Sequence, residues 1–144
     1  MIIRSYNFND NLSVYQIEKE CFSNEVRSLA VLEKTSSLDN FIGFVAEENN
    51  AIVGYITATY CLDECDIITV AVSNKFRNKG VATSLINALI ENLKSKGVTS
   101  LFLEVRESNV SAIKLYEKVG FTKLSVRKNY YEGVENAINY LLKI

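Results

Sequence analysis

The sequence predicts an α/β (α+β) domain in which a mixed central sheet of about seven strands is flanked by about four helices. Short runs rich in β-branched residues alternate with longer segments whose apolar residues recur at helical spacing. The 144 residues, 48% of them hydrophobic, are enough for one full core. No proline, internal repeat or shift in composition marks a linker, so we expect a single domain over residues 1–144.

Patterning in the first half of the chain predicts a strand, two helices and a hairpin. Polar residues at 9–11 supply N-caps for the first helix, and its apolar side consists of Leu12, Val14, Tyr15, Ile17 and Cys21. The second helix begins at Ser23 and has a narrower apolar stripe of Val26, Leu29 (or Ala30) and Leu32. Asparagines within 48–50 tolerate the positive φ of a hairpin turn. The elements in order are a strand at 1–6, helices up to about 22 and 34, and strands at 41–47 and 51–62.

The most informative stretch is an apolar strand that leads through a basic loop into a long helix. Residues 66–72 are rich in β-branched residues, as expected of an inner strand that is covered on both faces. After the loop at 73–80, a helix runs to about Lys96, with an apolar stripe of Val81, Leu85, Leu89 and Leu93. The first turn of a helix has backbone N–H groups without internal partners and the positive end of the macrodipole. This loop can therefore bind an anion.

The last third of the chain predicts a strand, a short helix and two further strands. Alternation along the strand at 98–106 places Glu104 on the same face as Phe102 and Arg106. Asn109 is the expected N-cap of the helix at 109–119, which Gly120 closes. The remaining strands are expected at 121–127 and 136–143.

Composition excludes several classes of function. A net charge of −1 gives no basic footprint, so we expect no nucleic-acid partner. No apolar run approaches the ~18 residues that span a bilayer, and no signal peptide is apparent, so we expect a cytoplasmic protein without a membrane partner. The chain has no histidine, which removes Ser-His and Cys-His nucleophile pairs and leaves Cys61-x-x-x-Cys65 without partners for zinc. We therefore expect no metal, reduced thiols, and acid–base chemistry by Glu, Asp, Tyr, Lys or Cys.

The loop before the long helix carries the motif Arg77-x-x-Gly80-x-Ala82. It lacks the G-x-x-x-x-G-K-[ST] of a mononucleotide P-loop and the G-x-G-x-x-G of a dinucleotide fold. It resembles the Q/R-x-x-G-x-G/A motif of the GCN5-related N-acetyltransferase (GNAT) superfamily, whose loop binds the pyrophosphate of acetyl-coenzyme A (acetyl-CoA). Small residues at 80 and 82 let the backbone approach a diphosphate, and Arg77 and Lys79 add positive charge. The alternative is an ordinary strand-to-helix turn with exposed basic residues.

The predicted order of elements, β-α-α-β-β-β-α-β-α-β-β, also resembles the GNAT order over essentially the whole chain. This resemblance implies a sheet that is splayed between its fourth and fifth strands. It further implies that the pantetheine arm of acetyl-CoA lies in the splay like an added strand, with main-chain hydrogen bonds from Val70, Ala71 and Val72.

A second motif, L-x-L-E-V-R-x-S-N-x-x-A-x-x-L-Y-x-x-x-G-F, covers 101–121 and is followed by Arg127-Lys-Asn-Tyr-Tyr131. It resembles the bacterial ribosomal-protein-alanine N-acetyltransferases, which acetylate the N-terminal α-amine of a small-subunit ribosomal protein. By matching positions, the resemblance implies a proton acceptor at Glu104 and a proton donor at Tyr116. The cofactor contacts that it implies are Val70, Ala71, Val72, Arg77, Asn78, Lys79, Gly80, Val81, Ala82, Thr83 and Asn109.

The implied chemistry is direct transfer from acetyl-CoA to an amine in a ternary complex, without a metal or a covalent enzyme intermediate. A protein α-amine has a pKa of about 7.7–8.0, so on the order of a tenth of it is already neutral at pH 7. A glutamate of ordinary acidity, near pKa 4.3, is a weak base for such an amine. Glu104 therefore needs either desolvation by its apolar neighbours or a relaying water. An ordinary tyrosine, near pKa 10, could protonate the leaving thiolate at a cost of about 2 kcal/mol.

Alternatives remain at this point. Glu104 could be a strand-end carboxylate paired with Arg106, and Tyr116 a plain core residue. The chain lacks the Pro-Trp pair of the closer family after its first helix, and it differs at Asn78, Ala82 and Asn136. The acceptor could thus be a small-molecule amine or another protein N-terminus, and the fold could be a non-catalytic acetyl-CoA-binding module. Phe22, Tyr130 and Tyr131 either line an acceptor groove or pack internally.

Overall fold

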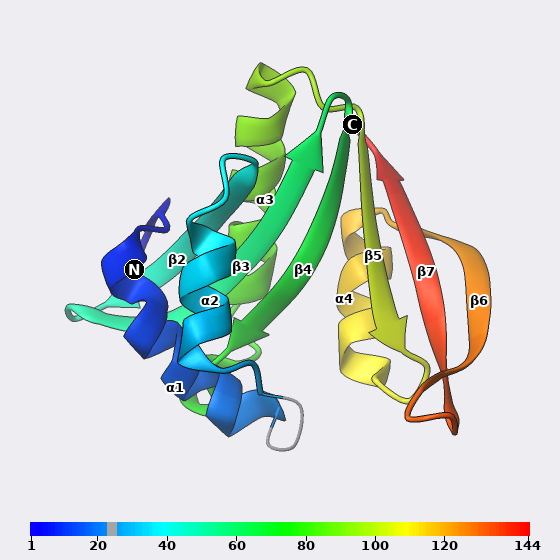
Figure 1. Ribbon diagram of the computed structural model, residues 1–144, viewed down its shortest axis with the longest axis horizontal. Coiled ribbons are helices and arrows are strands. Elements are labelled where there is room, and N and C mark those ends of the chain that lie inside the picture. Colours follow the sequence, from blue (N-terminus) through cyan, green and yellow to red (C-terminus); the bar gives the residue numbers. More distant parts are fainter. Residues whose placement is uncertain (23–25) are drawn as a thin grey trace.

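The computed structural model describes residues 1–22 and 26–144, in which seven strands form one mixed sheet flanked by four α-helices (Figure 1). The strands are β1 (Ile2–Ser5), β2 (Phe41–Glu48), β3 (Ala51–Cys61), β4 (Glu64–Val72), β5 (Ser100–Arg106), β6 (Thr122–Tyr131) and β7 (Glu135–Lys143). The helices are α1 (Asn11–Phe22), α2 (Leu29–Ser36), α3 (Val81–Ser95) and α4 (Val110–Val119), with short 3-10 helices η1 (Phe8–Asp10) and η3 (Asn74–Phe76). The predicted fold class and order of elements are confirmed.

The sheet divides into two halves that meet at β4 and β5. Its strand order is β1-β2-β3-β4-β5-β7-β6, and β4–β5 is the parallel pair among otherwise antiparallel neighbours. The β4–β5 pairing covers only the rows Glu64 with Ser100, Cys65 with Leu101, and Asp66 with Phe102. Beyond these rows the two strands diverge, as the inverted V in Figure 1 shows. The predicted splay is therefore present, and it leaves 67–72 of β4 without a partner in β5.

Helices cover the two faces of the sheet unequally. In Figure 1, α1 and α2 lie in front of β2, β3 and β4, whereas α3 and α4 lie behind the sheet. The predicted stripe of α3 is buried against the sheet, with Leu85, Leu89 and Leu93 each 0% exposed. Full burial of one such side chain stabilises a fold by about 1.5–3 kcal/mol. No described helix covers the front of β5, β7 and β6, so that side of the splay is accessible.

The structure corrects the first two helices. α2 begins at Leu29, because Ser28 acts as its N-cap and accepts a hydrogen bond from Val31 N at 3.2 Å. The predicted start at Ser23 lies outside the described residues. In α1, Val14 and Ile17 of the predicted apolar side are buried, but Leu12 is 59% exposed, and Glu18, which was not predicted to be buried, is 1% exposed.

The turns follow the sequence prediction more closely. Asn49 and Asn50 adopt positive φ values of 51° and 66° in the β2–β3 hairpin. Asn109 caps α4 by accepting a hydrogen bond from Ala112 N at 3.2 Å, and Gly120 ends the helix at φ 121°. β6 continues to Tyr131, four residues past its predicted end at Arg127, through an irregular stretch in which Asn129 has φ 52°. None of the described helices is long and apolar enough to cross a membrane.

Candidate active site

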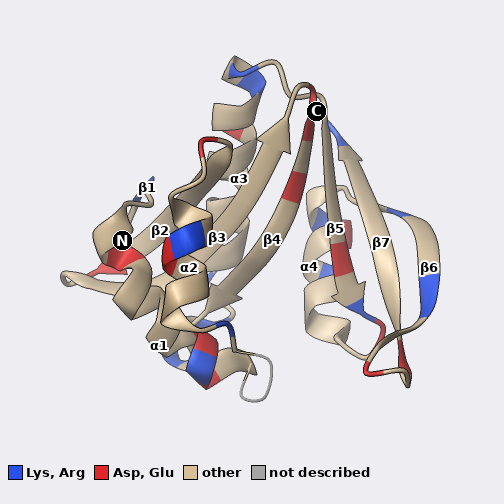
Figure 2. Ribbon diagram, viewed as in Figure 1, with Lys and Arg blue, Asp and Glu red and all other residues tan. Residues whose placement is uncertain are grey.

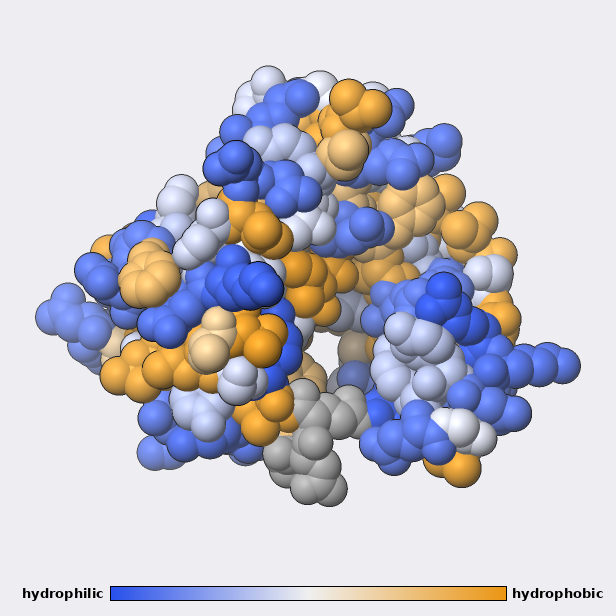
Figure 3. All heavy atoms as spheres, viewed as in Figure 1, coloured by the Kyte–Doolittle hydropathy of each residue, from blue (hydrophilic) through white to orange (hydrophobic). Residues whose placement is uncertain are grey.

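Two adjoining cavities occupy the splay between β4 and β5. The loop cavity, about 670 Å³, lies between the end of β4, the 73–80 loop, and the first turns of α3 and α4. The central cavity, about 660 Å³, lies between α1, β4, β5 and α4 and reaches Tyr131. Figure 3 shows the molecule hollowed between its two halves at this place. The residues that line both cavities are Cys21, Phe22, Val70, Asn109, Ala112 and Tyr116.

The loop cavity contains a helix start with free backbone donors. Gly80 is the N-cap of α3 in the left-handed conformation, at φ 78° and ψ 11°, and Asn78 is also left-handed at φ 60°. The first backbone bond of α3 runs from Ser84 N to Gly80 O at 3.0 Å, so the amides at 81–83 have no intrahelical acceptor. These amides, together with the positive end of α3, fit the oxygens of a diphosphate.

Ten of the eleven sequence-predicted cofactor residues line the loop cavity, namely Val70, Ala71, Val72, Arg77, Asn78, Gly80, Val81, Ala82, Thr83 and Asn109. Lys79 is the exception: its Nζ lies over the ring of Phe76, 5.5 Å from the ring centroid. The guanidinium of Arg77 also differs from expectation. Its Nε donates to Val72 O at 3.1 Å and its Nη2 to Cys21 Sγ at 3.3 Å, so it braces β4 against α1.

Tyr116 lies in the middle of α4 and lines both cavities. It is 8% exposed, and its ring packs edge-to-face on Phe121 with the centroids 5.8 Å apart. Burial, with a smaller contribution from nearby Tyr131, raises the pKa of Tyr116 to about 12. The phenol is therefore protonated throughout the neutral range, as a proton donor requires.

Glu104 lies on β5 and lines the central cavity but is not among the described residues of the loop cavity. Its side chain is 31% exposed, and its Oε1 lies 3.5 Å from Arg127 Nη1 on β6. Of the two alternatives, this exposure and the ion pair favour a relaying water over desolvation by apolar neighbours. The alternative was an ion pair between Glu104 and Arg106. In the structure Glu104 pairs with Arg127 instead, and Arg106 forms ion pairs with Glu135 at 2.9 Å and Glu132 at 3.4 Å.

A polar network in the wall of the central cavity was missed by sequence reasoning. Glu18 accepts hydrogen bonds from Arg27 Nε at 3.0 Å, Arg27 N at 3.1 Å and Tyr55 Oη at 2.8 Å. Arg27 also reaches Thr69 Oγ1 on β4 at 3.3 Å. A signal was available: Glu18 stands directly after Ile17 and four positions after Val14, on the buried stripe of α1. A carboxylate at such a position needs a charged partner.

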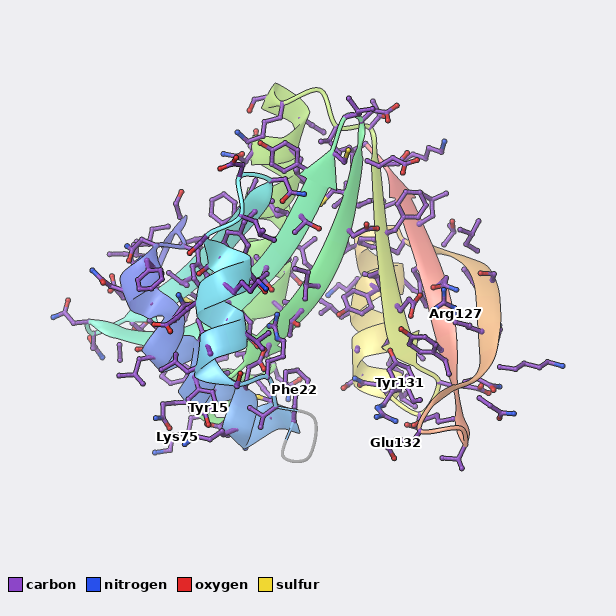
Figure 4. All side chains as sticks on the ribbon, in the orientation of Figure 1. Tyr15, Phe22, Lys75, Arg127, Tyr131 and Glu132 are labelled. Carbon is purple, nitrogen blue, oxygen red and sulfur yellow. The ribbon has the colours of Figure 1, made fainter. Side chains whose placement is uncertain are left out.

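Aromatic residues border the opening on both sides. Figure 4 shows Phe22 at the end of α1 and Tyr131 at the end of β6, across the splay from one another. Phe22 lines both cavities, and Tyr131 lines the central one. The guanidinium of Arg106 stacks over Tyr131 at 4.3 Å, and that of Arg127 over Tyr130 at 4.5 Å. The first contact holds the ring of Tyr131 in the wall of the central cavity.

In the described residues, no group of three or more His, Cys, Asp or Glu side chains is placed to hold a metal ion. The residues at the splay thus offer an anion-binding helix start on one side and a glutamate with a protonated tyrosine on the other. Such an arrangement can bind a phosphorylated donor and move protons during transfer to a nucleophile.

Comparison with known proteins places this geometry in a family. The model of the acetyltransferase (GNAT) family matches residues 11–121. The [ribosomal protein bS18]-alanine N-acetyltransferase of Haemophilus influenzae is 40% identical over 109 residues, which cover 73% of this chain and 74% of the relative. The Escherichia coli K12 enzyme of the same name is 35% identical over 109 residues, covering 74% of each chain.

Solved structures agree with the sequence relatives. The crystal structure of the ribosomal-protein-S18-alanine N-acetyltransferase from Escherichia coli matches with a TM-score of 0.92 at 31% identity, covering 99% of this chain and 93% of that one. Ard1 from Thermoplasma volcanium matches with a TM-score of 0.87 at 28% identity, covering 99% and 97% of the two chains. The family match and the sequence relatives agree, and this chain belongs to the acetyltransferase (GNAT) family and is an acetyl-CoA-dependent N-acetyltransferase.

Proposed function

We propose that this enzyme acetylates the N-terminal α-amine of a ribosomal protein that begins with alanine. The observation that carries the proposal is the position of Tyr116 between the two cavities, with Glu104 on the wall of the central cavity. A donor bound in one cavity and an amine bound in the other would meet beside both side chains. The names of the relatives from Haemophilus influenzae and Escherichia coli support this acceptor.

The loop cavity is the proposed site for acetyl-CoA, which supplies an activated acetyl thioester. The amides at 81–83 and the left-handed Gly80 would hold its pyrophosphate. Main-chain groups of Val70, Ala71 and Val72, on the part of β4 that β5 leaves unpaired, would bind the pantetheine arm. Arg77 positions this part of β4 through its bond to Val72 O.

Glu104 is the proposed proton acceptor and works through a water, because its side chain is exposed and paired with Arg127. The acceptor amine itself assists, since a group of pKa about 7.7–8.0 is on the order of one-tenth neutral at pH 7. The role of the carboxylate is to take, through that water, the proton of the ammonium form, which leaves the neutral amine to attack the thioester.

Tyr116 is the proposed proton donor to the departing thiolate. With its pKa near 12, donation to a thiolate of pKa about 8.5 is uphill by about 5 kcal/mol, against about 2 for an ordinary tyrosine. A barrier of about 16 kcal/mol corresponds to a turnover of about 10 s⁻¹, so this cost lies within the range of an ordinary enzyme.

The alternative acceptors are another protein N-terminus and a small-molecule amine. The first is favoured by a Saccharolobus solfataricus relative named N-alpha-acetyltransferase, which is 36% identical over 107 residues. The second is compatible with Asn78, Ala82 and Asn136, where this chain departs from the closer family.

A thiol-release assay separates these acceptors. The substrates are a peptide with the free N-terminus of a ribosomal protein beginning with alanine, an N-blocked copy that carries a lysine, and a panel of small amines. Turnover with the free α-amine alone supports the proposal. Turnover confined to the lysine copy or to small amines would contradict it.

A further inference from the structure

A third cavity extends the path along which an acceptor would lie. The front cavity, about 760 Å³, runs over the front of β4, β5, β7 and β6. It shares Ile68, Glu104 and Tyr131 with the central cavity, so the two are continuous at the proposed proton acceptor. In Figure 1 this side of β5 and β7 has no helix over it. A polymer whose end reaches Glu104 therefore has a surface along which its next residues can lie.

The register of the sheet gives the scale of this path. Asp66 pairs with Phe102, two residues before Glu104 on β5, and Glu64 pairs with Ser100, four residues before it. At a rise of about 3.3 Å per residue, these rows lie about 7 and 13 Å from the row of Glu104. An extended peptide also advances about 3.3–3.6 Å per residue. A peptide with its first residue at Glu104 would bring its third to fifth residues past Asp66 and Glu64.

The lining of the front cavity suits an extended peptide with basic residues. Its acidic members are Glu64, Asp66 and Glu104, and Figure 2 shows acidic positions along β4 and β5. The basic residue in the lining, Arg127, already pairs with Glu104. Neither Glu64 nor Asp66 has an ion pair with any other residue in 1–22 or 26–144. Two carboxylates therefore face the cavity without a cation.

Apolar side chains in the same cavity are accessible. Ile68 is 40% exposed, Leu124 56% and Tyr130 48%. Ile68 comes from β4 and the other two from β6, and Phe102 of β5 lines the same cavity. An extended peptide on a sheet presents alternate side chains to it, so a surface with both apolar groups and carboxylates can contact apolar and basic side chains of such a peptide.

We propose that the front cavity binds the residues that follow the acetylated N-terminal residue, and that Glu64 and Asp66 select arginine or lysine at the third to fifth positions of the acceptor. This inference rests on the proposed function, because it requires a polypeptide acceptor. Glu64 and Asp66 act on specificity alone and take no part in the transfer chemistry.

The test compares two octapeptides that both begin Ala-Ser. One has arginine at positions 3 and 5, and the other has citrulline there, which keeps the shape of arginine and removes its charge. We expect the arginine peptide to have a roughly three- to tenfold higher kcat/KM at low ionic strength, which lies within the range that two exposed ion pairs give. The preference should shrink in 0.5 M salt, where the Debye length is about 4 Å and exposed charges are largely screened.

Isosteric variants assign the preference to this cavity. In the Glu64→Gln/Asp66→Asn double variant, the preference for arginine should fall below about twofold, with kcat for the citrulline peptide unchanged. The matched control is Asp39→Asn/Glu91→Gln, which removes the same two charges from exposed positions outside the three cavities and should keep the preference. Equal kcat/KM for both peptides in the wild type, or a preference that survives in the double variant, would overturn the inference.

A binding measurement keeps this inference separate from the proposed acceptor. The fluorescent forms of both peptides are titrated with the protein saturated with coenzyme A. If neither peptide is acetylated, at least threefold tighter binding of the arginine peptide, lost in Glu64→Gln/Asp66→Asn, would sustain the front-cavity inference while the proposed acceptor fails. Equal binding of the two peptides would overturn the inference itself.

Discussion

The hydroxyl of Tyr116 is the group on which proton delivery depends in the proposed reaction. Because its ring packs on Phe121, replacement by phenylalanine keeps the packing and removes only the hydroxyl. We expect Tyr116→Phe to lower kcat by roughly 10²- to 10⁴-fold, the usual contribution of general acid–base catalysis. Thiol release gives kcat, and thermal unfolding shows whether the fold is intact.

Tyr140 offers a matched control for this change. It is 1% exposed, its hydroxyl donates to Glu117 Oε2 at 2.9 Å, and it is not among the described lining residues of the three cavities. Tyr140→Phe also removes a hydroxyl from a buried ring, yet it should leave kcat within about threefold of wild type. Wild-type kcat in a folded Tyr116→Phe variant would remove Tyr116 from the mechanism.

Glu104 gives a prediction that depends on pH. Glu104→Gln removes the proton acceptor, so its activity should be lowest near pH 6, where the acceptor amine is almost fully protonated. As pH rises through about 7.7–8.0 the amine deprotonates without help, so the deficit relative to wild type should shrink toward pH 9. Tyr116, with its pKa near 12, remains protonated over this range and adds no falling limb.

The measurement for Glu104→Gln is the ratio of wild-type to variant kcat/KM between pH 6 and 9. Stability should change little, because the ion pair of Glu104 with Arg127 is exposed and such pairs contribute about 0–1 kcal/mol. A ratio that is constant across this range would show that Glu104 does not take the proton of the amine.

At the scale of elements, the Glu18–Arg27 pair ties α1 to the segment before α2 and to β4. Glu18 is 1% exposed and accepts hydrogen bonds from Arg27 and Tyr55. Removal of the arginine therefore leaves a buried carboxylate without its counter-ion. We expect Arg27→Met to lower the free energy of unfolding by about 3–5 kcal/mol. Urea denaturation measures this loss.

The control for the element-scale prediction is Arg127→Met, because its pair with Glu104 is exposed. That variant should cost less than about 1 kcal/mol. If the two arginine variants lost the same stability, the buried network would not be what anchors α1 to the sheet.

At the scale of the whole molecule, what could be predicted from the sequence follows from local rules. The order of strands and helices, the cap at Asn109 and the glycine at the start of α3 depend on residues within a few positions of one another. The central strand was recognised because an inner strand needs apolar residues on both faces. The splay and the residues of the loop cavity came from the family resemblance, which the motif around Gly80 carried.

What the sequence left open depends on which elements pack together. The partner of Glu104 is Arg127, on a strand that joins β5 only through β7, and no local pattern identifies it. The position of the Arg77 guanidinium depends on its hydrogen bond to Sγ of Cys21, a residue of α1 that is distant in the sequence. The burial of Glu18 depends on Arg27 and on Tyr55 of β3. Arg27 lies in the described stretch 26–28, outside any helix, so no helical pattern identifies this pairing.

The central claim is that the two adjoining cavities hold the donor and the amine together for direct transfer. A bisubstrate analogue, with coenzyme A joined through an acetyl group to the α-nitrogen of an alanine peptide, tests this most directly. We predict that the enzyme binds it at least 10²-fold more tightly than coenzyme A or the peptide alone, because one ligand then fills both cavities. Binding no tighter than that of coenzyme A would contradict the account.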